Sequence, residues 1–231
     1  MAAKLARPML LAMPKKHTIG VFDSGAGGLS VARTIEKALP QHTVIFKNDN
    51  KHVPYGTRQP AEILAFIIPI FEALITEGCA VIVVACNTVS TTLINELRAQ
   101  FRVPLIAMEP MVKPAAQLTT SQVIAVCATP TTLASSRYAD LKRQYAANLK
   151  VIEPDCADWS SLIEYNQLNQ QRIIEDLQPA LDAGADVIVL GCTHYHWIEA
   201  DIISLTKGRV TVLQPEPAVI TQLVRVLAQL T

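Results

Sequence analysis

Two segments of this chain recur further along it, and this internal repeat constrains the fold more strongly than any other feature. Residues 77–88 align with residues 183–194, and in both copies an apolar run of strand length ends in a cysteine. Residues 19–24 align with residues 124–129 at almost the same separation. Because two independent segments share nearly one offset, we predict a duplicated α/β unit rather than a chance likeness of apolar strands.

The pattern between the repeats favours parallel sheets. Short runs rich in β-branched residues alternate with longer helical patterns, which is typical of βαβ units. Strands are expected at 18–22, 43–46, 81–85, 103–106, 123–126, 149–152 and 187–190, and helices at 29–39, 61–77, 89–101, 131–147, 168–183 and 218–230. Pro69 should kink or split its helix, and Pro104 favours an edge position for its strand, because proline donates no backbone hydrogen bond.

These elements predict an α/β fold with two pseudo-symmetric, doubly wound, flavodoxin-like domains, each built on a parallel sheet. We assign residues 17–107 together with residues 209–231 to the first domain, and residues 108–208 to the second. Residues 1–16 are interpreted as a flexible extension, because their apolar run, bounded by two prolines, is too short for a signal peptide.

Composition and charge exclude several classes of protein. Of the 231 residues, 50% are hydrophobic, which suits a sizeable core and excludes intrinsic disorder. The formal net charge is zero and there is no basic run, so we expect no nucleic-acid partner. Apolar runs are far shorter than the ~18 residues needed to cross a bilayer, so no membrane partner is expected. The five cysteines fit no disulfide framework, and we expect reduced thiols in the cytoplasm.

Cys86 and Cys192 follow the repeated strands, where a loop leads toward a helix. Ligands of open α/β sheets bind beyond the carboxyl ends of the strands, so both thiols are candidate site residues. The start of a helix also favours the thiolate form of a cysteine. Cys79, Cys127 and Cys156 are interpreted as core residues, because cysteine is among the most frequently buried residue types.

Two thiols that face one another suit a reaction that is itself nearly symmetric. One nucleophilic cysteine suffices for acyl transfer, whereas stereoinversion removes a proton from one face of a carbon and returns one to the other. A single base would have to cross the molecular plane, but two fixed groups can each serve one face. The pair therefore favours stereoinversion, of which racemisation of an amino acid is an example.

Four blocks of sequence carry a resemblance to a known family. They are FDSGAGGLSV at 22–31, VPYGTR at 53–58, ACNT at 85–88 and GCTHY at 191–195, with two further blocks at 109–115 and 128–132. Together they resemble the glutamate racemase family, the cofactor-independent branch of the aspartate/glutamate racemases. The match runs in the family's order over about residues 18 to 227, and this combination is highly specific.

The resemblance implies that glutamate is racemised between the two domains, which supplies D-glutamate for peptidoglycan biosynthesis. Cys86 matches the thiol that deprotonates D-glutamate, and Cys192 matches the thiol that deprotonates L-glutamate. Asp23 and His194 match the residues thought to assist Cys86 and Cys192, respectively. The positions that match substrate contacts are Asp23, Ser24, Pro54, Tyr55, Gly56, Cys86, Asn87, Thr88, Thr129, Thr132, Thr193 and His194. The family also implies a homodimer.

The same residues also permit plainer interpretations. The serine, asparagine and threonine side chains can bind carboxylates without adding negative charge, although each could equally cap a helix. His194 and His196 lie near Cys192, but no C-x-x-C pair accompanies them, so we expect no metal site. The glycine-rich turn lacks the dinucleotide spacing, and the four main blocks contain no lysine for a pyridoxal Schiff base. We therefore expect no cofactor.

The chain departs from the family's pattern at three places. Asn48-Asp49-Asn50 replaces the usual Gly-Asp-Thr and follows Lys47, which stands in place of an apolar residue. His196-Trp197 replaces a proline and an apolar residue, near the expected wall of the site. Gln214-Pro215-Glu216 stands where Asp-Pro or Asp-Ser is common. None of these departures removes a catalytic group.

Three other functions stay open from the sequence. The chain could racemise aspartate or another amino acid, because no motif measures the length of the pocket. It could be a cysteine hydrolase that uses Cys192 with His194, which predicts a covalent acyl intermediate and no need for Cys86. It could also be a non-catalytic, racemase-like protein that binds glutamate without exchanging its α-proton.

Overall fold

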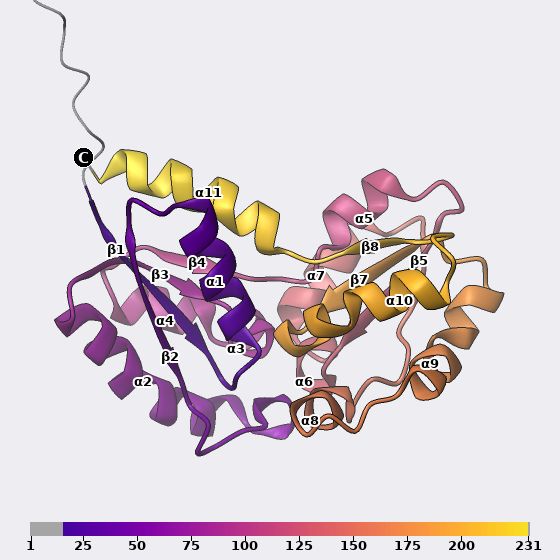
Figure 1. The fold of residues 1–231 in the computed structure, drawn as a ribbon, viewed down its shortest axis with the longest axis horizontal. Helices are drawn as coiled ribbons and strands as arrows, with labels where there is room; N and C mark the ends of the chain where they lie inside the picture. The colour runs from indigo at the N-terminus through magenta and orange to yellow at the C-terminus, as the bar shows by residue number, and fades with distance from the viewer. Residues whose placement is uncertain (1–15, 231) are drawn as a thin grey trace, which may run out of the picture.

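The computed structural model describes residues 16–230 and contains two four-stranded parallel sheets with flanking helices (Figure 1). The first sheet has the order β2 (Thr43–Asn48), β1 (Thr18–Asp23), β3 (Cys79–Val84), β4 (Leu105–Ala107), and the second has the order β6 (Lys150–Ile152), β5 (Val123–Ala128), β7 (Val187–Gly191), β8 (Thr211–Leu213). The strand order is the same in both sheets. The predicted α/β fold with two pseudo-symmetric parallel sheets is therefore confirmed.

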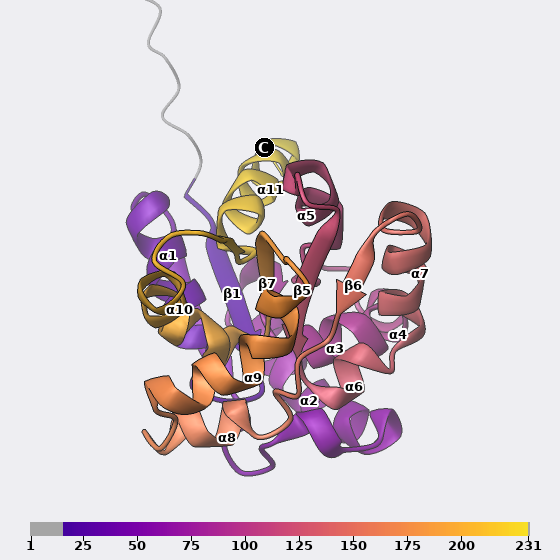
Figure 2. The same cartoon turned by 90° about the vertical axis from the view of Figure 1, so that its right-hand side faces the viewer.

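The helices connect successive strands and cover both faces of each sheet (Figures 1 and 2). They are α1 (Gly28–Ala38), α2 (Pro60–Thr76), α3 (Asn87–Thr92), α4 (Ile94–Gln100), α5 (Val112–Leu118), α6 (Pro130–Leu133), α7 (Ser136–Tyr145), α8 (Trp159–Glu164), α9 (Gln170–Asp182), α10 (Glu199–Leu205) and α11 (Glu216–Gln229), with short 3₁₀ turns η1 (Tyr55–Thr57) and η2 (Thr193–Ile198). Such coverage explains why the central strands are almost continuously apolar, since both of their faces are buried.

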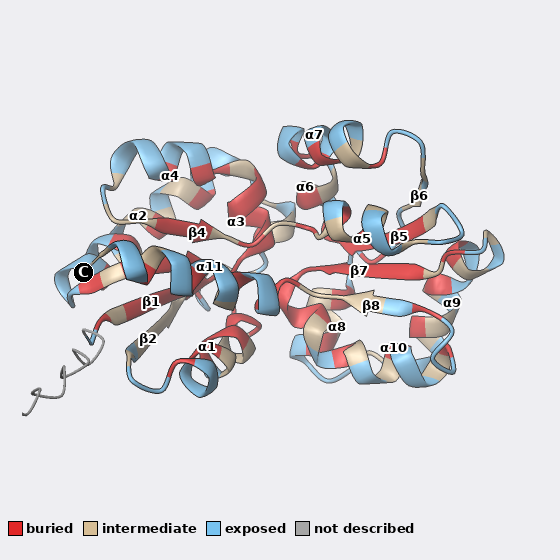
Figure 3. Cartoon of the chain, turned by 90° about the horizontal axis from the view of Figure 1, so that it is seen from above, coloured by how far each residue is buried: buried red, intermediate tan, exposed pale blue. Residues whose placement is uncertain are grey.

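Each sheet is packed between two layers of apolar side chains. In β3, for example, Ile82 packs into the cluster on one face and Val83 into the cluster on the other, because successive side chains of a strand point to opposite faces. The central strands β1, β3, β5 and β7 are the most deeply buried parts of the molecule (Figure 3). The loops at their carboxyl ends are therefore held on a rigid base.

Several predicted helices have different limits in the structure. Helix α2 is not split at Pro69, because that residue and Ala65, whose carbonyl loses its partner, are both exposed to water. The helix expected at 89–101 is divided at Leu93 into α3 and α4. The helix expected at 131–147 is divided before α7, where the Ser135 side chain accepts a hydrogen bond from the Tyr138 amide. The strand expected at 103–106 starts two residues later, directly after Pro104, and lies at an edge as predicted.

The chain crosses between the halves twice, after β4 and after β8. Strand β8 pairs with β7, with Thr211 opposite Val187, so the segment 209–231 begins in the second sheet and not in the first domain as predicted. The segment returns only with α11, which packs beside α1 on the first sheet (Figures 1 and 2). The other domain boundaries assigned from the sequence stay a proposal. Of the extension proposed at 1–16, only residue 16 lies within the described part of the chain. Within the described part, no helix is long and apolar enough to span a bilayer.

Candidate active site

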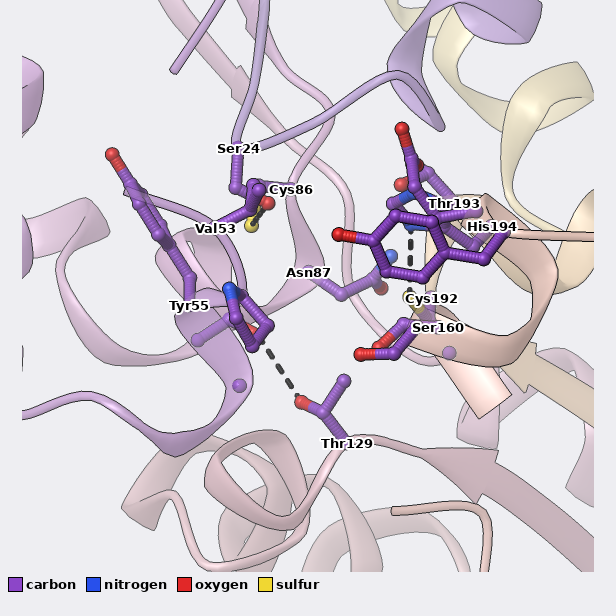
Figure 4. A pocket seen from close by; sticks show the side chains of 17 residues that line it. Ser24, Val53, Tyr55, Cys86, Asn87, Thr129, Ser160, Cys192, Thr193 and His194 are labelled. Atoms are coloured by element: carbon purple, nitrogen blue, oxygen red, sulfur yellow. Dashed lines mark hydrogen bonds and ion pairs between the residues drawn. The ribbon is translucent and has the colours of Figure 1, made fainter. Parts of the chain in front are cut away.

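A cavity of about 80 Å³ lies between the two halves, at the carboxyl ends of the central strands. Most of the predicted catalytic and substrate-contacting residues line it, and these are Ser24, Pro54, Tyr55, Gly56, Cys86, Asn87, Thr88, Thr129, Cys192, Thr193 and His194. Figure 4 shows Cys86 with Ser24 on one side and Cys192 with Thr193 and His194 on the other. The two repeat-related thiols therefore enter one pocket from different domains.

Cys86 lies between β3 and α3, and its side chain is buried. Its Sγ lies 3.5 Å from the Ser24 Oγ, to which the thiol donates. Burial raises the pKa of Cys86 to about 12, and the negative charge of Asp23 acts in the same direction. The amides of Ser24 and of Val89, at the start of α3, lower the pKa of this thiol in the direction that the sequence predicts, but burial outweighs them.

Cys192 follows β7 and precedes η2. Its Sγ lies 4.0 Å from Nδ1 of His194, and the other ring nitrogen of His194 lies 2.5 Å from Oε2 of Glu164 on α8. Burial raises the pKa of the Cys192 thiol as well. A thiol, an imidazole and a carboxylate thus form a chain on this side of the pocket, an arrangement that can move a proton to or from the sulfur.

Asp23 ends β1 and lies behind the pocket lining, fully buried. Its Oδ2 accepts hydrogen bonds from the Gly28 amide at 2.6 Å and from the Thr193 hydroxyl at 3.1 Å, so one carboxylate joins α1 to the second domain. A Cβ on Gly28 would lie 2.4 Å from the Asp23 Cβ, so only glycine permits this approach. Burial raises the pKa of Asp23, and the nearby His194 partly opposes that shift.

The polar lining is neutral apart from Glu164 and His194, and within residues 16–230 no lysine or arginine reaches the pocket. The hydroxyls of Thr88 and Thr129 lie 3.1 Å apart across the two halves. Thr132 lies outside the lining and contacts Thr129, with 3.0 Å between the hydroxyl oxygens. The carboxamide of Asn87 is buried, and neither its oxygen nor its nitrogen has a hydrogen-bond partner in the described part. Leaving such groups unpaired costs about 1–3 kcal/mol each, so the pocket is built for a ligand that both donates and accepts.

The segment that carries Pro54, Tyr55 and Gly56 forms another wall. The Tyr55 hydroxyl donates to the Asp49 carboxylate at 2.6 Å and points away from the thiols (Figure 4). Asp49 also contacts His52 at 2.8 Å. The Tyr55 hydroxyl is therefore occupied within its own segment, and the side chain contributes to the shape of the pocket.

Comparison with known proteins agrees with this geometry. Residues 19–223 match the sequence profile of the Asp/Glu/Hydantoin racemase family. The chain belongs to that family. A glutamate racemase of Ralstonia pickettii is 38% identical over 214 residues, covering 91% of this chain and 76% of the relative, and one of Ectopseudomonas mendocina is 39% identical over 216 residues, covering 91% and 82%.

The solved structures of this family have the same fold. The crystal structure of Escherichia coli glutamate racemase in complex with L-glutamate and the activator UDP-MurNAc-ala superposes with a TM-score of 0.85 at 29% identity, covering 93% of this chain and 83% of that one. Within residues 16–230, no group of three or more histidine, cysteine, aspartate or glutamate side chains is arranged to hold a metal ion.

Six residues that line the pocket were not predicted from the sequence. They are Val53, Ser160, Ser161, Glu164, Tyr165 and Gly191. Four of them belong to α8 or follow it directly, and this helix of six residues is too short to give a periodic pattern. Nothing in the sequence near Glu164 indicated its contact with His194, because the two residues belong to different elements.

The departures from the family's pattern all make contacts. Lys47 forms an ion pair with Glu77 at 2.7 Å, and the Asn48 amide donates to the Gly25 carbonyl at 3.2 Å. His196 contacts Glu216, so two separate departures meet in the fold. The ring of Trp197 is tilted against that of His194, with 5.6 Å between the ring centroids.

Proposed function

We propose that this protein is a glutamate racemase that interconverts L- and D-glutamate by proton transfer between two thiols, without a cofactor. One observation carries the proposal: Cys86 and Cys192 line the same buried pocket from repeat-related positions in opposite halves. The glutamate racemases among the relatives, and the L-glutamate complex among the similar structures, support glutamate as the substrate.

In the direction from D-glutamate, the thiolate of Cys86 accepts the α-proton, and the electron pair stays on the substrate as a carbanion. The Cys192 thiol then donates its proton to the opposite face, which leaves L-glutamate, a neutral Cys86 and a Cys192 thiolate. The reverse reaction starts from that form of the protein. No atom is lost and no electron leaves the substrate, so the step balances without a redox partner.

Both thiols need help to ionise, because burial raises the pKa of each. We assign this help to His194 at Cys192, with Glu164 holding the far ring nitrogen. At Cys86 we assign it to Asp23 as an acceptor of the thiol proton, although the negative charge of Asp23 by itself raises the pKa of Cys86. The positive ammonium group of the substrate would also stabilise a neighbouring thiolate. Neutral hydroxyl and amide groups of residues such as Asn87 and Thr193 would bind the carboxylates without competing charge.

The test uses two variants in deuterated water. Cys86→Ser and Cys192→Ser should each abolish racemisation, with Cys86→Ser impairing α-proton exchange of D-glutamate and Cys192→Ser that of L-glutamate. Nuclear magnetic resonance of the α-proton follows exchange in both enantiomers. Small and equal losses in the two variants would refute the proposal. Parallel assays with L-aspartate, followed by loss of optical rotation, test the substrate.

A second candidate is a cysteine hydrolase, favoured by the chain of contacts from Cys192 through His194 to Glu164. That function predicts a covalent acyl intermediate visible by mass spectrometry and full activity of Cys86→Ser. A racemase predicts neither. A non-catalytic binding protein would retain glutamate binding without exchange of the α-proton.

The proposal places the enzyme in the cytoplasm, where it would supply D-glutamate for peptidoglycan biosynthesis. Restoration of growth in a bacterial strain that requires D-glutamate tests this role. A homodimer is part of the same proposal, and light scattering on the purified protein tests it.

A further inference from the structure

A buried polar pair outside the pocket joins the two halves of the molecule. His196 lies in η2, four residues after Cys192, and Glu216 is the first residue of α11. The His196 Nδ1 and the Glu216 Oε1 are 3.1 Å apart, and the two side chains are 4% and 9% exposed. The proposed chemistry uses neither residue.

Glu216 also binds the first turns of α1. Its Oε1 accepts a hydrogen bond from Ser30 at 3.0 Å, and its Oε2 accepts one from Thr34 at 2.7 Å. These bonds, with that from His196, outweigh the effect of burial and hold the pKa of Glu216 below its usual value. A single carboxylate therefore connects α1 and α11, on the first sheet, with η2, which belongs to the second half.

The same first turn of α1 packs closely against the turn that follows Cys192. A Cβ on Gly27 would lie 2.6 Å from the Thr193 hydroxyl oxygen, so the two segments touch with no room for a side chain. Ser30 donates to the Gly27 carbonyl as well as to Glu216. Hydrogen bonds and close packing thus connect Glu216, through the start of α1, with Thr193 at the edge of the pocket.

The substitution pattern supports a linked function for the pair. His196 stands where the resembled family has a proline, and Glu216 lies in the third departure, Gln214-Pro215-Glu216. Proline restricts its backbone to φ near −65°, so its replacement by histidine frees the turn after the catalytic cysteine. A hydrogen bond from that histidine to α11 restores the restriction through the side chain.

We propose that His196 and Glu216 are positioning residues that hold the Cys192–His194 turn against the first domain and so set the transfer of a proton at Cys192. This inference rests on the proposed racemase function. The second ring nitrogen of His196 is buried without a partner in the described part, so the contact with Glu216 is the interaction that orients the ring. Glu199 on α10 also interacts electrostatically with His196 and with Glu216.

The test compares primary deuterium isotope effects for α-deuterated L-glutamate and D-glutamate. Each isotope effect reports how strongly abstraction of that enantiomer's α-proton limits the rate. In His196→Ala and Glu216→Gln, the transfer at Cys192 should slow and kcat should fall roughly 10- to 100-fold, the scale of a small misplacement. The isotope effect should then rise for L-glutamate and fall for D-glutamate.

Three further variants sharpen the result. The double variant should be no slower than the worse single variant, because both remove the same contact. His196→Asn places an amide nitrogen where Nδ1 stood and should recover most of kcat. Glu199→Gln, the matched control, should keep the wild-type isotope effects.

Isotope effects do not depend on the fraction of folded enzyme, so the outcomes separate cleanly. Lower activity with unchanged isotope effects would mean a structural role only and would overturn the proposal. A shift in the opposite sense, toward D-glutamate, would place the perturbation at Cys86 and would also overturn it. Absence of racemisation by the wild-type protein would instead reject the proposed function itself.

Discussion

The two turns that carry the thiols occupy equivalent places in the two sheets but differ in their surroundings. On the first side, Cys86 contacts Ser24, with the Asp23 carboxylate buried nearby. On the second side, Cys192 faces an imidazole that contacts a carboxylate. The repeat aligns Thr88 with His194, and the backbones also differ, because Cys86 precedes the α-helix α3 whereas Cys192 precedes the 3₁₀ turn η2. Symmetry places the two sulfurs, whereas local substitutions decide how each one is ionised.

The largest expected effect tests what the two sides share, which is a buried and neutral thiol. Because burial raises the pKa of Cys86 to about 12, its thiolate becomes abundant only in strongly alkaline solution. The rate of alkylation by iodoacetamide should therefore rise about tenfold for each pH unit from 7 to 10, without levelling off. Mass spectrometry of the Cys86 peptide measures this rate. A plateau near pH 9 would indicate an ordinary thiol and contradict the account.

The next largest effects are expected from substitutions beside Cys192. His194→Ala should lower kcat by about 10²- to 10³-fold, since acid–base assistance contributes on that scale. Glu164→Gln should also lower kcat, but by a severalfold smaller factor. The isotope effect should rise for L-glutamate and fall for D-glutamate in both variants. Ser24→Ala, on the opposite side, should move the two isotope effects in the reverse sense. Identical patterns in all three variants would show that the sides do not act separately.

A smaller effect is expected from Asp23→Asn, which keeps the shape of the side chain. Removing the negative charge should lower the pKa of Cys86, because that charge raises it, and alkylation at a fixed pH should become severalfold faster. Racemisation should become slower, because Asp23 is the proposed proton acceptor on this side. If alkylation and racemisation both became faster, Asp23 would have no catalytic role.

The smallest effect concerns Thr88, the counterpart of His194 in the repeat. Thr88→Val removes the hydroxyl that contacts Thr129 across the halves at 3.1 Å, an interaction worth about 1 kcal/mol. We expect KM to rise about fivefold, with kcat nearly unchanged. Steady-state kinetics with both enantiomers measures the change. A loss of kcat as large as that of His194→Ala would mean that the two sides share one catalytic mechanism.

The sequence predicted the parts of this structure that depend on local pattern. Apolar strands and their repeat indicated both sheets. Because Cys86 and Cys192 directly follow those strands, the sequence also predicted that each thiol lies at the carboxyl end of its sheet. The short elements β8, α5, α8 and α10 were missed, because three to seven residues give too weak a periodicity.

Features that depend on contacts between distant segments could not be predicted. Glu164 meets His194 from another helix, and His196 meets Glu216 across the domain boundary. The net rise in the pKa of Cys86 could not be predicted either, because a helix start is visible in the sequence whereas the degree of burial is not. Local motifs therefore located the proposed catalytic groups, and tertiary packing determines their ionisation.

The direct test of a two-thiol transfer is the fate of the α-proton early in the reaction. L-Glutamate is incubated with the wild-type protein in deuterated water. At low conversion the two enantiomers are separated, and mass spectrometry measures the deuterium content of each. We predict that the D-glutamate formed carries deuterium at the α-carbon, while the remaining L-glutamate keeps its protium. D-Glutamate that retains the substrate's own proton would mean that one base serves both faces, and would contradict the account.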